Sequence, residues 1–395
     1  MELGVNLRVC VISGSRAEYG ALKWTLQQLK NSPEISAQFI ITGAHLIDRM
    51  GLTKTELLDD GNVPNIEIDL KIVDDQPEAI SIGLGNEIIE LSHAFSELKP
   101  DVVLVAGDRY EILMATLVAS LFGIPIAHIG GGETTEGSKD NMYRHAISQM
   151  ASFHFVENSK CRKNLINKGL ASDRIQIVGP TGVEDAFRRP FIVKEEVASD
   201  LEISQVHARW ILCTIHPATA SSEDPRVLVS ETLSSLDALE DCFVFLTGSN
   251  ADTGGQQIDS LLKDHAKKFP HKFRFYQHLG VRRYQDLMQN CHVVVGNSSS
   301  GLIEAPVFGI PSVNIGTRQK GRTKSNLVLD APVEHEEIYR AIERQISRSK
   351  VLPRKKKERP FPSTLIVERL KNIAITSSSN TRTLWKDSSQ GKSLL

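Results

Sequence analysis

The chain has 395 residues, of which 41% are hydrophobic and 24% are charged, and its formal net charge is −2. A chain of this length is too long for one ordinary hydrophobic core, which predicts two domains. The small net charge excludes a positive field over the whole protein that would attract nucleic acid. The five cysteines are scattered without a CxxC pair, which argues against a disulfide framework and a zinc knuckle. With no apolar stretch long enough to span a bilayer, we expect a cytoplasmic protein that binds neither nucleic acid nor membrane.

Short apolar runs alternate with longer segments of helical periodicity in the first half of the chain. A segment such as "YEILMATLVASLF" has the apolar spacing of a helix. The alternation is typical of a parallel sheet covered by helices on both faces. The runs that predict its strands are "LRVCVISGS", "QFIITGAHL", "DVVLVAGD", "IPIAHIGGG", "FHFVEN" and "IQIVG".

The pattern loosens into a charged stretch over residues 184–209 and then starts again. We therefore expect an α/β protein with two Rossmann-like doubly wound domains, over residues 1–190 and 191–362. Such sheets bind ligands outside the carboxyl ends of their strands, so two facing edges predict a cleft between the domains. The runs that predict the second set of strands are "WILCTIHP", "CFVFLTGSN", "FRFYQH", "HVVVGNSSS" and "PSVNIG".

The end of the chain is predicted from composition. Residues 363–374, "STLIVERLKNIA", are expected to form a last packed helix, and residues 375–395 have little to bury and predict a disordered tail. The basic run "PRKKKERP" predicts a solvated connection, with a phosphate-binding patch as the alternative.

The stretch "VVVGNSSSGLIEAPVFG" predicts an anion site in the second domain. A strand ends at Gly296, three serines follow, and a helix is expected from about Leu302, whose N-terminus would attract phosphate. Glu304 lies one turn into that helix, where its carboxylate could accept hydrogen bonds from the vicinal hydroxyls of a ribose. The alternative is an ordinary serine N-cap with an acidic first turn. The nearby cations that favour an anion are Arg318, Lys320 and Arg322.

Two strand ends of the first domain carry charged turns. Arg16 in "SGSRAEYG" could hold a phosphate with both guanidinium arms, or could form a surface ion pair with Glu18. Asp108 and Arg109 in "VAGDRYEIL" are site candidates, or could cap the following helix. Because the sequence contains no GxGxxG fingerprint, we expect no NAD cofactor.

The stretch "HIGGGETTEGSKDNMYRHA" places three glycines directly after a buried strand. We expect these glycines to let a substrate approach the bare backbone, with the carboxylates of Glu133 and Asp140 at the two ends of one loop. Arg144 and His145 lie about one turn beyond Asp140 and could orient it. Alternatively Asp140 caps the helix and pairs with Arg144 four residues later.

Polar turns also follow two strands of the second domain. "HPATASSED" contains His216, and a lone histidine after a strand more often has a structural role than a functional one. "GSNADTGG" contains Asn250 and Asp252, which could equally form a tight turn. HExxH is absent, and no compact cluster has zinc-ligand spacing, so no metal is expected.

Taken in order over residues 8–325, these motifs resemble the UDP-N-acetylglucosamine 2-epimerase family. They are most similar to its hydrolysing branch, which makes N-acetylmannosamine for sialic acid synthesis. The resemblance implies the GT-B architecture, UDP bound in the cleft, no cofactor, and a homo-oligomer, either a dimer or a tetramer. The motifs that carry it are "GSRAEYG", "GDRYE", "HIGGGE…D…RHA", "GSNADTG", "GNSSSGLIE" and "IGTRQKGR".

The resemblance also implies residue roles. Catalytic groups around the sugar would be Asp108, Glu133, Asp140, Arg144 and His145. The residues around UDP would be Arg16, His216, Asn250, Asp252, His278, Ser298, Ser299, Glu304 and Arg318. The chain has Gly130 where the non-hydrolysing branch and the animal bifunctional enzyme have a glutamate, and Glu133 would take over that role.

The implied reaction eliminates UDP to form 2-acetamidoglucal and then adds water to give N-acetylmannosamine. Four alternatives remain open: the same reaction on UDP-2,4-diacetamido-2,4,6-trideoxyglucose for legionaminic acid, a non-hydrolysing epimerase, a GT-B glycosyltransferase, and a sugar-nucleotide sensor without turnover.

Overall fold

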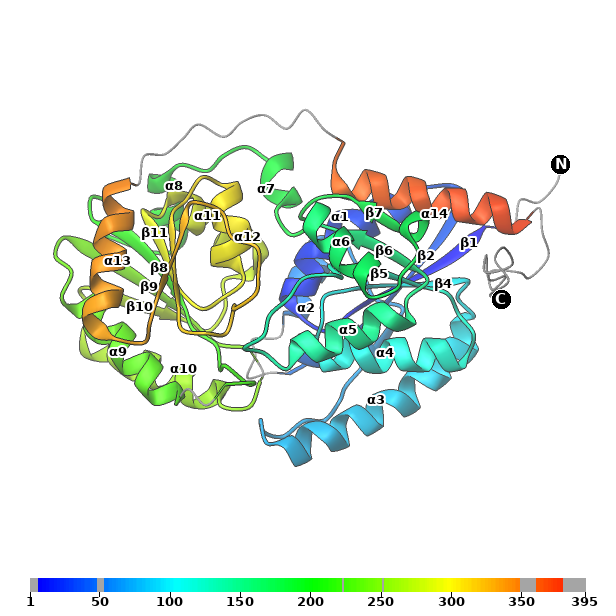
Figure 1. Ribbon diagram of the computed structural model, residues 1–395, viewed down its shortest axis with the longest axis horizontal. Helices are drawn as coiled ribbons and strands as arrows, with labels where there is room; N and C mark the ends of the chain where they lie inside the picture. Colours follow the sequence, from blue (N-terminus) through cyan, green and yellow to red (C-terminus); the bar gives the residue numbers. More distant parts are fainter. Residues whose placement is uncertain (1–5, 48–52, 222–223, 251, 349–359, 379–395) are drawn as a thin grey trace, which may run out of the picture.

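The computed structural model describes residues 6–47, 53–221, 224–250, 252–348 and 360–378. These residues form two parallel sheets in two neighbouring bodies, and helices cover both faces of each sheet (Figure 1). The predicted architecture of two Rossmann-like doubly wound domains is therefore confirmed. The basic run at residues 353–360, singled out in the sequence, lies almost wholly outside the described residues.

The first sheet has the strand order β3-β2-β1-β4-β5-β6-β7, with all neighbours parallel. The order reverses between β1 and β4, the place at which doubly wound sheets bind ligands. The strands are β1 (Leu7–Ser13), β2 (Ile35–Thr42), β3 (Ile66–Ile68), β4 (Val102–Ala106), β5 (Ile126–Ile129), β6 (Phe153–Val156) and β7 (Ile175–Ile177).

Both faces of this sheet are buried, which explains the continuous apolar runs. Val9 and Val11 of β1 point into the core that includes Leu22 of α1, whereas Ile12 points into the core that includes Phe95 of α3. The helices of this half are α1 (Arg16–Lys30), α2 (Lys54–Asp59), α3 (Pro77–Leu98), α4 (Tyr110–Leu121), α5 (Asp140–Met150) and α6 (Ser159–Asn167).

The second sheet repeats the design with the order β10-β9-β8-β11-β12-β13, again parallel throughout. Its strands are β8 (Arg209–Thr214), β9 (Cys242–Thr247), β10 (Phe273–Tyr276), β11 (Val293–Gly296), β12 (Ser312–Ile315) and β13 (Val328–Ala331). The helices of this half are α7 (Glu184–Arg188), α8 (Lys194–Asp200), α9 (Pro225–Asp237), α10 (Gly255–Lys268), α11 (Gly280–Asn290), α12 (Ser300–Val307) and α13 (His335–Arg348).

Every apolar run predicted to be a strand forms one, but the sequence analysis missed β3 and β13. Both are edge strands with a neighbour on one side only. Each is short and carries partly buried or exposed positions, so neither has the unbroken apolar run of a central strand.

Residues 363–374 lie within α14 (Pro362–Ser378), which returns to the first body and packs beside α1 (Figure 1). Its Ile366, Val367 and Leu370 are buried in the same core as β1. The helix runs to Ser378, into the segment expected to be a disordered tail, because "KNIAITSS" contains no glycine or proline to end it. Residues 379–395 lie outside the described part of the chain.

None of the helices in the described residues combines the length and the apolar composition that a bilayer crossing requires.

The buried face of α14 makes the stability of the first body depend on the end of the chain. Leu370→Ala should lower the free energy of unfolding by about 2–5 kcal/mol, because it leaves a cavity against β1 and α1. Urea denaturation measures the change, and Glu368→Ala, at an exposed position of the same helix, is the control. Equal stability of the two variants would show that α14 does not contribute to this core.

Candidate active site

The carboxyl ends of the two sheets face each other across a cleft of about 360 Å³. Loops after β1, β4, β5 and β6 form one wall, and loops after β8 to β12 form the other. The predicted site residues that line this cleft are Arg16, Asp108, Glu133, Asp140, Arg144, His216, Asn250, His278, Ser298, Ser299, Glu304 and Arg318.

The serine turn after β11 forms part of the second body's wall. Gly296 has a φ of 121°, and a Cβ there would lie 2.1 Å from the carbonyl oxygen of Thr214, so the turn requires glycine. Helix α12 begins at Ser300 and presents its free N–H groups and positive dipole end here. Ser299 occupies the N-cap position without a capping hydrogen bond, which leaves its hydroxyl free for a ligand.

His216 is held as a neutral hydrogen-bond donor. Its Nδ1 accepts the backbone N–H of Asn250 at 3.1 Å, so in the neutral ring the proton is on Nε2. Burial, followed by the charges of Arg318 and Arg16, lowers the pKa of His216 well below its usual range. The Nε2–H of this neutral ring could donate a hydrogen bond to an oxygen of a diphosphate.

Glu304 and Arg16 meet the cleft from opposite bodies. Burial raises the pKa of Glu304 to about 7, and the charge of Arg16 opposes this rise. The alternative of an Arg16–Glu18 surface pair is wrong, because Glu18 is buried and accepts the Gly14 backbone N–H at 2.6 Å. A pair of ribose hydroxyls would supply donors to the half-buried Glu304 carboxylate.

Arg144 connects the loops after β4 and β5. One guanidinium nitrogen pairs with Asp108, and another donates to the carbonyl oxygen of Glu133 at 3.2 Å and to the hydroxyl of Thr135 at 2.9 Å. Burial lowers the pKa of Arg144 to about 9, so it remains a cation at neutral pH. The predicted alternative, an ion pair with Asp140, does not form in the structure.

Two glycines of the run have a different role from the one expected. A Cβ at Gly131 would lie 2.9 Å from the hydroxyl of Ser148, and one at Gly132 would lie 2.3 Å from the carbonyl oxygen of Cys161. These two glycines therefore make room for the protein's own chain, and only Gly130 lines the cleft.

The Glu133 carboxylate is fixed by three groups. Its Oε1 accepts the Cys161 thiol at 2.7 Å and the Asn158 amide at 3.4 Å. Its Oε2 lies 3.4 Å from the Arg322 guanidinium. These three contacts fix the orientation of the Glu133 side chain in the wall of the cleft.

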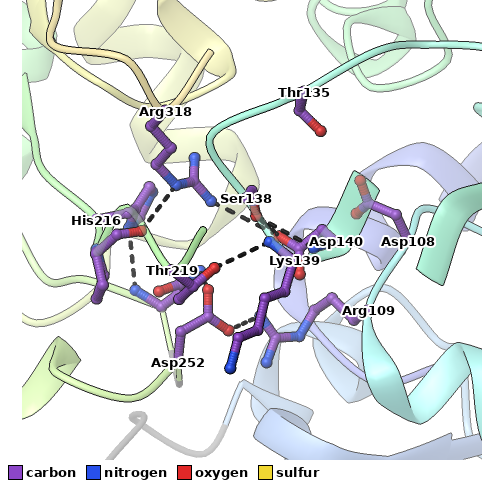
Figure 2. A network of polar contacts seen from close by, with 12 residues as sticks. Asp108, Arg109, Thr135, Ser138, Lys139, Asp140, His216, Thr219, Asp252 and Arg318 are labelled. Atoms are coloured by element: carbon purple, nitrogen blue, oxygen red, sulfur yellow. Dashed lines mark hydrogen bonds and ion pairs between the residues drawn. The ribbon is translucent and has the colours of Figure 1, made fainter. Parts of the chain in front are cut away.

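Asp140 is the first residue of α5 and lies where the two bodies meet (Figure 2). Its carboxylate accepts the Ser138 hydroxyl at 2.9 Å and lies 3.8 Å from the Arg318 guanidinium of the second body. Burial, followed by the charge of Asp252, raises the pKa of Asp140. A buried carboxylate with a raised pKa suits a group that takes up and releases protons.

Two predicted residues lie outside the cleft lining. Asp252 is buried and pairs with Arg109 at 3.1 Å, an ion pair that joins the bodies (Figure 2). His145 is half-buried beside Lys168 and Arg144, whose charges add to burial in lowering its pKa. His145 is the next residue after Arg144 and lies about 100° further round the helix, and it is not among the residues that line the cleft.

Glu157 and Tyr284 are among the cleft residues that the sequence analysis did not assign to the site, and Arg322, which it named only as a nearby cation, also lines the cleft. Glu157 could have been found, because it is a charged residue directly after the buried run "FHFV", as Asp108 follows "VVLVAG". Tyr284 lies within α11, where nothing in the sequence distinguishes it; its hydroxyl contacts that of Ser300 at 2.7 Å. In the part of the chain that the structure describes, no group of three or more His, Cys, Asp or Glu residues is placed to hold a metal ion.

Comparison with known proteins agrees with this arrangement. A family model described as UDP-N-acetylglucosamine 2-epimerase matches residues 27–373. The GDP/UDP-N,N'-diacetylbacillosamine 2-epimerase (hydrolyzing) of Campylobacter jejuni is 32% identical over 82% of this chain and 84% of its own length. The polysialic acid biosynthesis protein P7 of Escherichia coli is 32% identical over 85% of each chain.

Solved structures share the fold at lower identity. The UDP-GlcNAc 2-epimerase of Neisseria meningitidis bound to UDP-GlcNAc has a TM-score of 0.74 at 20% identity, covering 93% of this chain and 100% of its own. The Methanocaldococcus jannaschii UDP-GlcNAc 2-epimerase in complex with UDP-GlcNAc and UDP has a TM-score of 0.73 at 20% identity, with the same coverage of 93% and 100%. With the family model spanning most of its length, the chain belongs to the UDP-N-acetylglucosamine 2-epimerase family.

Proposed function

We propose that the chain is a hydrolysing UDP-N-acetylglucosamine 2-epimerase that converts UDP-N-acetylglucosamine and water to N-acetylmannosamine and UDP, for sialic acid-type nonulosonate synthesis. The observation that supports this most is the pairing, in one cleft, of an anion-binding wall after β11 with a carboxylate-bearing wall after β4 and β5. The reaction needs both, because a diphosphate leaves C1 while a proton leaves C2.

The chemistry explains why the two walls act together. The C2 hydrogen of the sugar is not acidic on its own. As the C1–O bond breaks, positive charge grows on the ring and the C2 hydrogen becomes removable by a carboxylate. Preorganised donors that stabilise the departing diphosphate lower the barrier to this step. Water then adds across the double bond of 2-acetamidoglucal, with protonation on the opposite face of C2.

We assign the residues of the anion-binding wall to UDP and the residues of the carboxylate-bearing wall to the sugar. UDP would contact the serine turn with Ser298 and Ser299, the Nε2–H of His216 and the guanidinium of Arg318, all of which line the cleft. Asp140 would remove the C2 proton, because it is buried and has a raised pKa.

The other two carboxylates would have supporting roles. Asp108 pairs with Arg144, and Glu133 is fixed by Cys161, Asn158 and Arg322. Both would therefore bind and orient the sugar.

Two relatives favour a second candidate substrate. The proteins of Campylobacter jejuni and Legionella pneumophila, at 32% and 29% identity, are named hydrolysing 2-epimerases of N,N'-diacetylbacillosamine nucleotides. That sugar is 2,4-diacetamido-2,4,6-trideoxyglucose, which would lead to legionaminic acid. It differs from N-acetylglucosamine at C4 and C6, away from the reacting C1 and C2.

The wild-type protein should release UDP and free N-acetylmannosamine from UDP-N-acetylglucosamine without added NAD or metal. In deuterium oxide the product should carry deuterium at C2, because an enzyme group in exchange with solvent delivers the new proton. NMR identifies the sugar and the label. UDP-N-acetylmannosamine as the product would exclude the hydrolysing reaction, and turnover of the trideoxy sugar alone would select the second candidate.

Glu304→Gln should weaken UDP binding by at least about tenfold, because hydrogen bonds to a charged group contribute roughly 1.5–3 kcal/mol. Titration calorimetry with UDP measures the affinity. Glu97→Gln, which removes a carboxylate from the exposed face of α3, is the control. If the two variants bind UDP equally well, Glu304 does not contact the nucleotide.

Asp140→Asn should lower turnover by roughly 10²–10⁴-fold, the contribution of a positioned acid or base. His145→Ala, a variant on the same helix but outside the cleft lining, should retain turnover. Release of UDP, followed by a coupled assay, measures both variants. Near-normal turnover of Asp140→Asn would show that this carboxylate is structural, and a loss in His145→Ala would restore the role first expected for that histidine.

A further inference from the structure

Glu157 is a cleft carboxylate to which the proposed mechanism has given no role. It is the first residue after β6, at the same sheet edge as the β5 loop that carries Glu133. It lines the cleft and is partly buried. The strand order therefore brings the two glutamates to one wall.

In the described part of the chain, no group hydrogen-bonds to the Glu157 carboxylate, and its pKa responds to burial and to charges alone. Its neighbour Glu133 has both oxygens engaged, and Asp108 has an arginine partner. The titratable groups that face Glu157 are Arg322 after β12, Glu133 in the glycine loop, Arg144 of α5, Cys161 of α6 and Glu304 of α12.

Burial raises the pKa of Glu157 to about 7, with Arg322 opposing the rise and Glu133 adding to it. Both the protonated and the deprotonated form of such a group are accessible near neutral pH. A general acid is most effective when its pKa lies close to the working pH.

Glu157 and Asp140 meet the cleft in different surroundings. The charges that most affect the pKa of Asp140 belong to Asp252, Arg109 and Arg318. Those that affect Glu157 belong to Arg322, Glu133 and Arg144, and the two sets share no member. Inversion at C2 needs one group that removes a proton from one face of the sugar and another that supplies a proton to the opposite face.

We propose that Glu157 is the general acid of the hydration step, an inference that rests on the proposed function. The proton of its carboxyl group moves to C2 of 2-acetamidoglucal, the electrons of the double bond form the new C2–H bond, and the oxygen of a water bonds to C1. The second proton of that water leaves to solvent, and solvent returns a proton to Glu157. The sum is one water added to the glycal.

The test is the product distribution of Glu157→Gln with UDP-N-acetylglucosamine. The amide keeps the size of the side chain but cannot donate a proton to carbon. UDP release should continue, while 2-acetamidoglucal accumulates in place of N-acetylmannosamine, with hydration slowed roughly 10²–10⁴-fold. Proton NMR detects the vinyl hydrogen at C1 of the glycal, and Glu97→Gln is the matched control.

A second measurement supplies 2-acetamidoglucal and UDP directly. Wild-type protein should hydrate the glycal at a rate that falls as pH rises through about 7, because the acid form is then lost. Calorimetry with UDP checks that Glu157→Gln is folded and binds the nucleotide.

Two results would overturn the inference while leaving the proposed function intact. One is N-acetylmannosamine formed by Glu157→Gln at the wild-type rate. The other is a loss of UDP release without any glycal, which would assign Glu157 to elimination. By contrast, a wild-type protein that turns over neither UDP-sugar would overturn the proposed function itself, and this inference with it.

Discussion

The buried guanidinium of Arg144 is the contact on which the carboxylate wall depends. It pairs with Asp108 after β4 and donates to the carbonyl oxygen of Glu133 and the hydroxyl of Thr135 after β5. A buried cation is tolerated only with such partners, because its desolvation costs several kcal/mol. The positions of the two loops are therefore coupled, and a displacement of either loop would shift the other through Arg144.

The sheets explain why the chemistry is confined to one edge of each body. Both faces of every central strand are covered by helices, so only the loops beyond the strand ends are free to carry polar groups. The glycine loop also bonds to the second body, where Gly137 accepts the N–H of Ala220 at 3.3 Å and Glu136 donates to the carbonyl of Lys320 at 2.9 Å. The carboxylate wall is thus tied by backbone hydrogen bonds to the anion-binding wall.

Central strands and strand-end motifs could be predicted from the sequence because two-sided burial forces unbroken apolar runs. The edge strands β3 and β13 were missed because acidic residues interrupt their short apolar runs, whereas the edge strands β7 and β10 were found. The glycines suggested an approach to substrate, but the neighbours that crowd Gly131 and Gly132 come from α5 and α6. Only the fold reveals such contacts. His145 was favoured because it lies about one turn beyond Asp140 in sequence, but it is not among the residues that line the cleft.

Helix α14 has a consequence for how the cleft can open. The chain leaves the first body before Arg209, builds the second sheet, and comes back after Arg348 to lay α14 beside α1. The bodies are thus joined by two covalent connections. A single tether would allow one body to swivel freely against the other. With two connections, any opening of the cleft has to leave both ends of the segment that builds the second sheet attached to the first body.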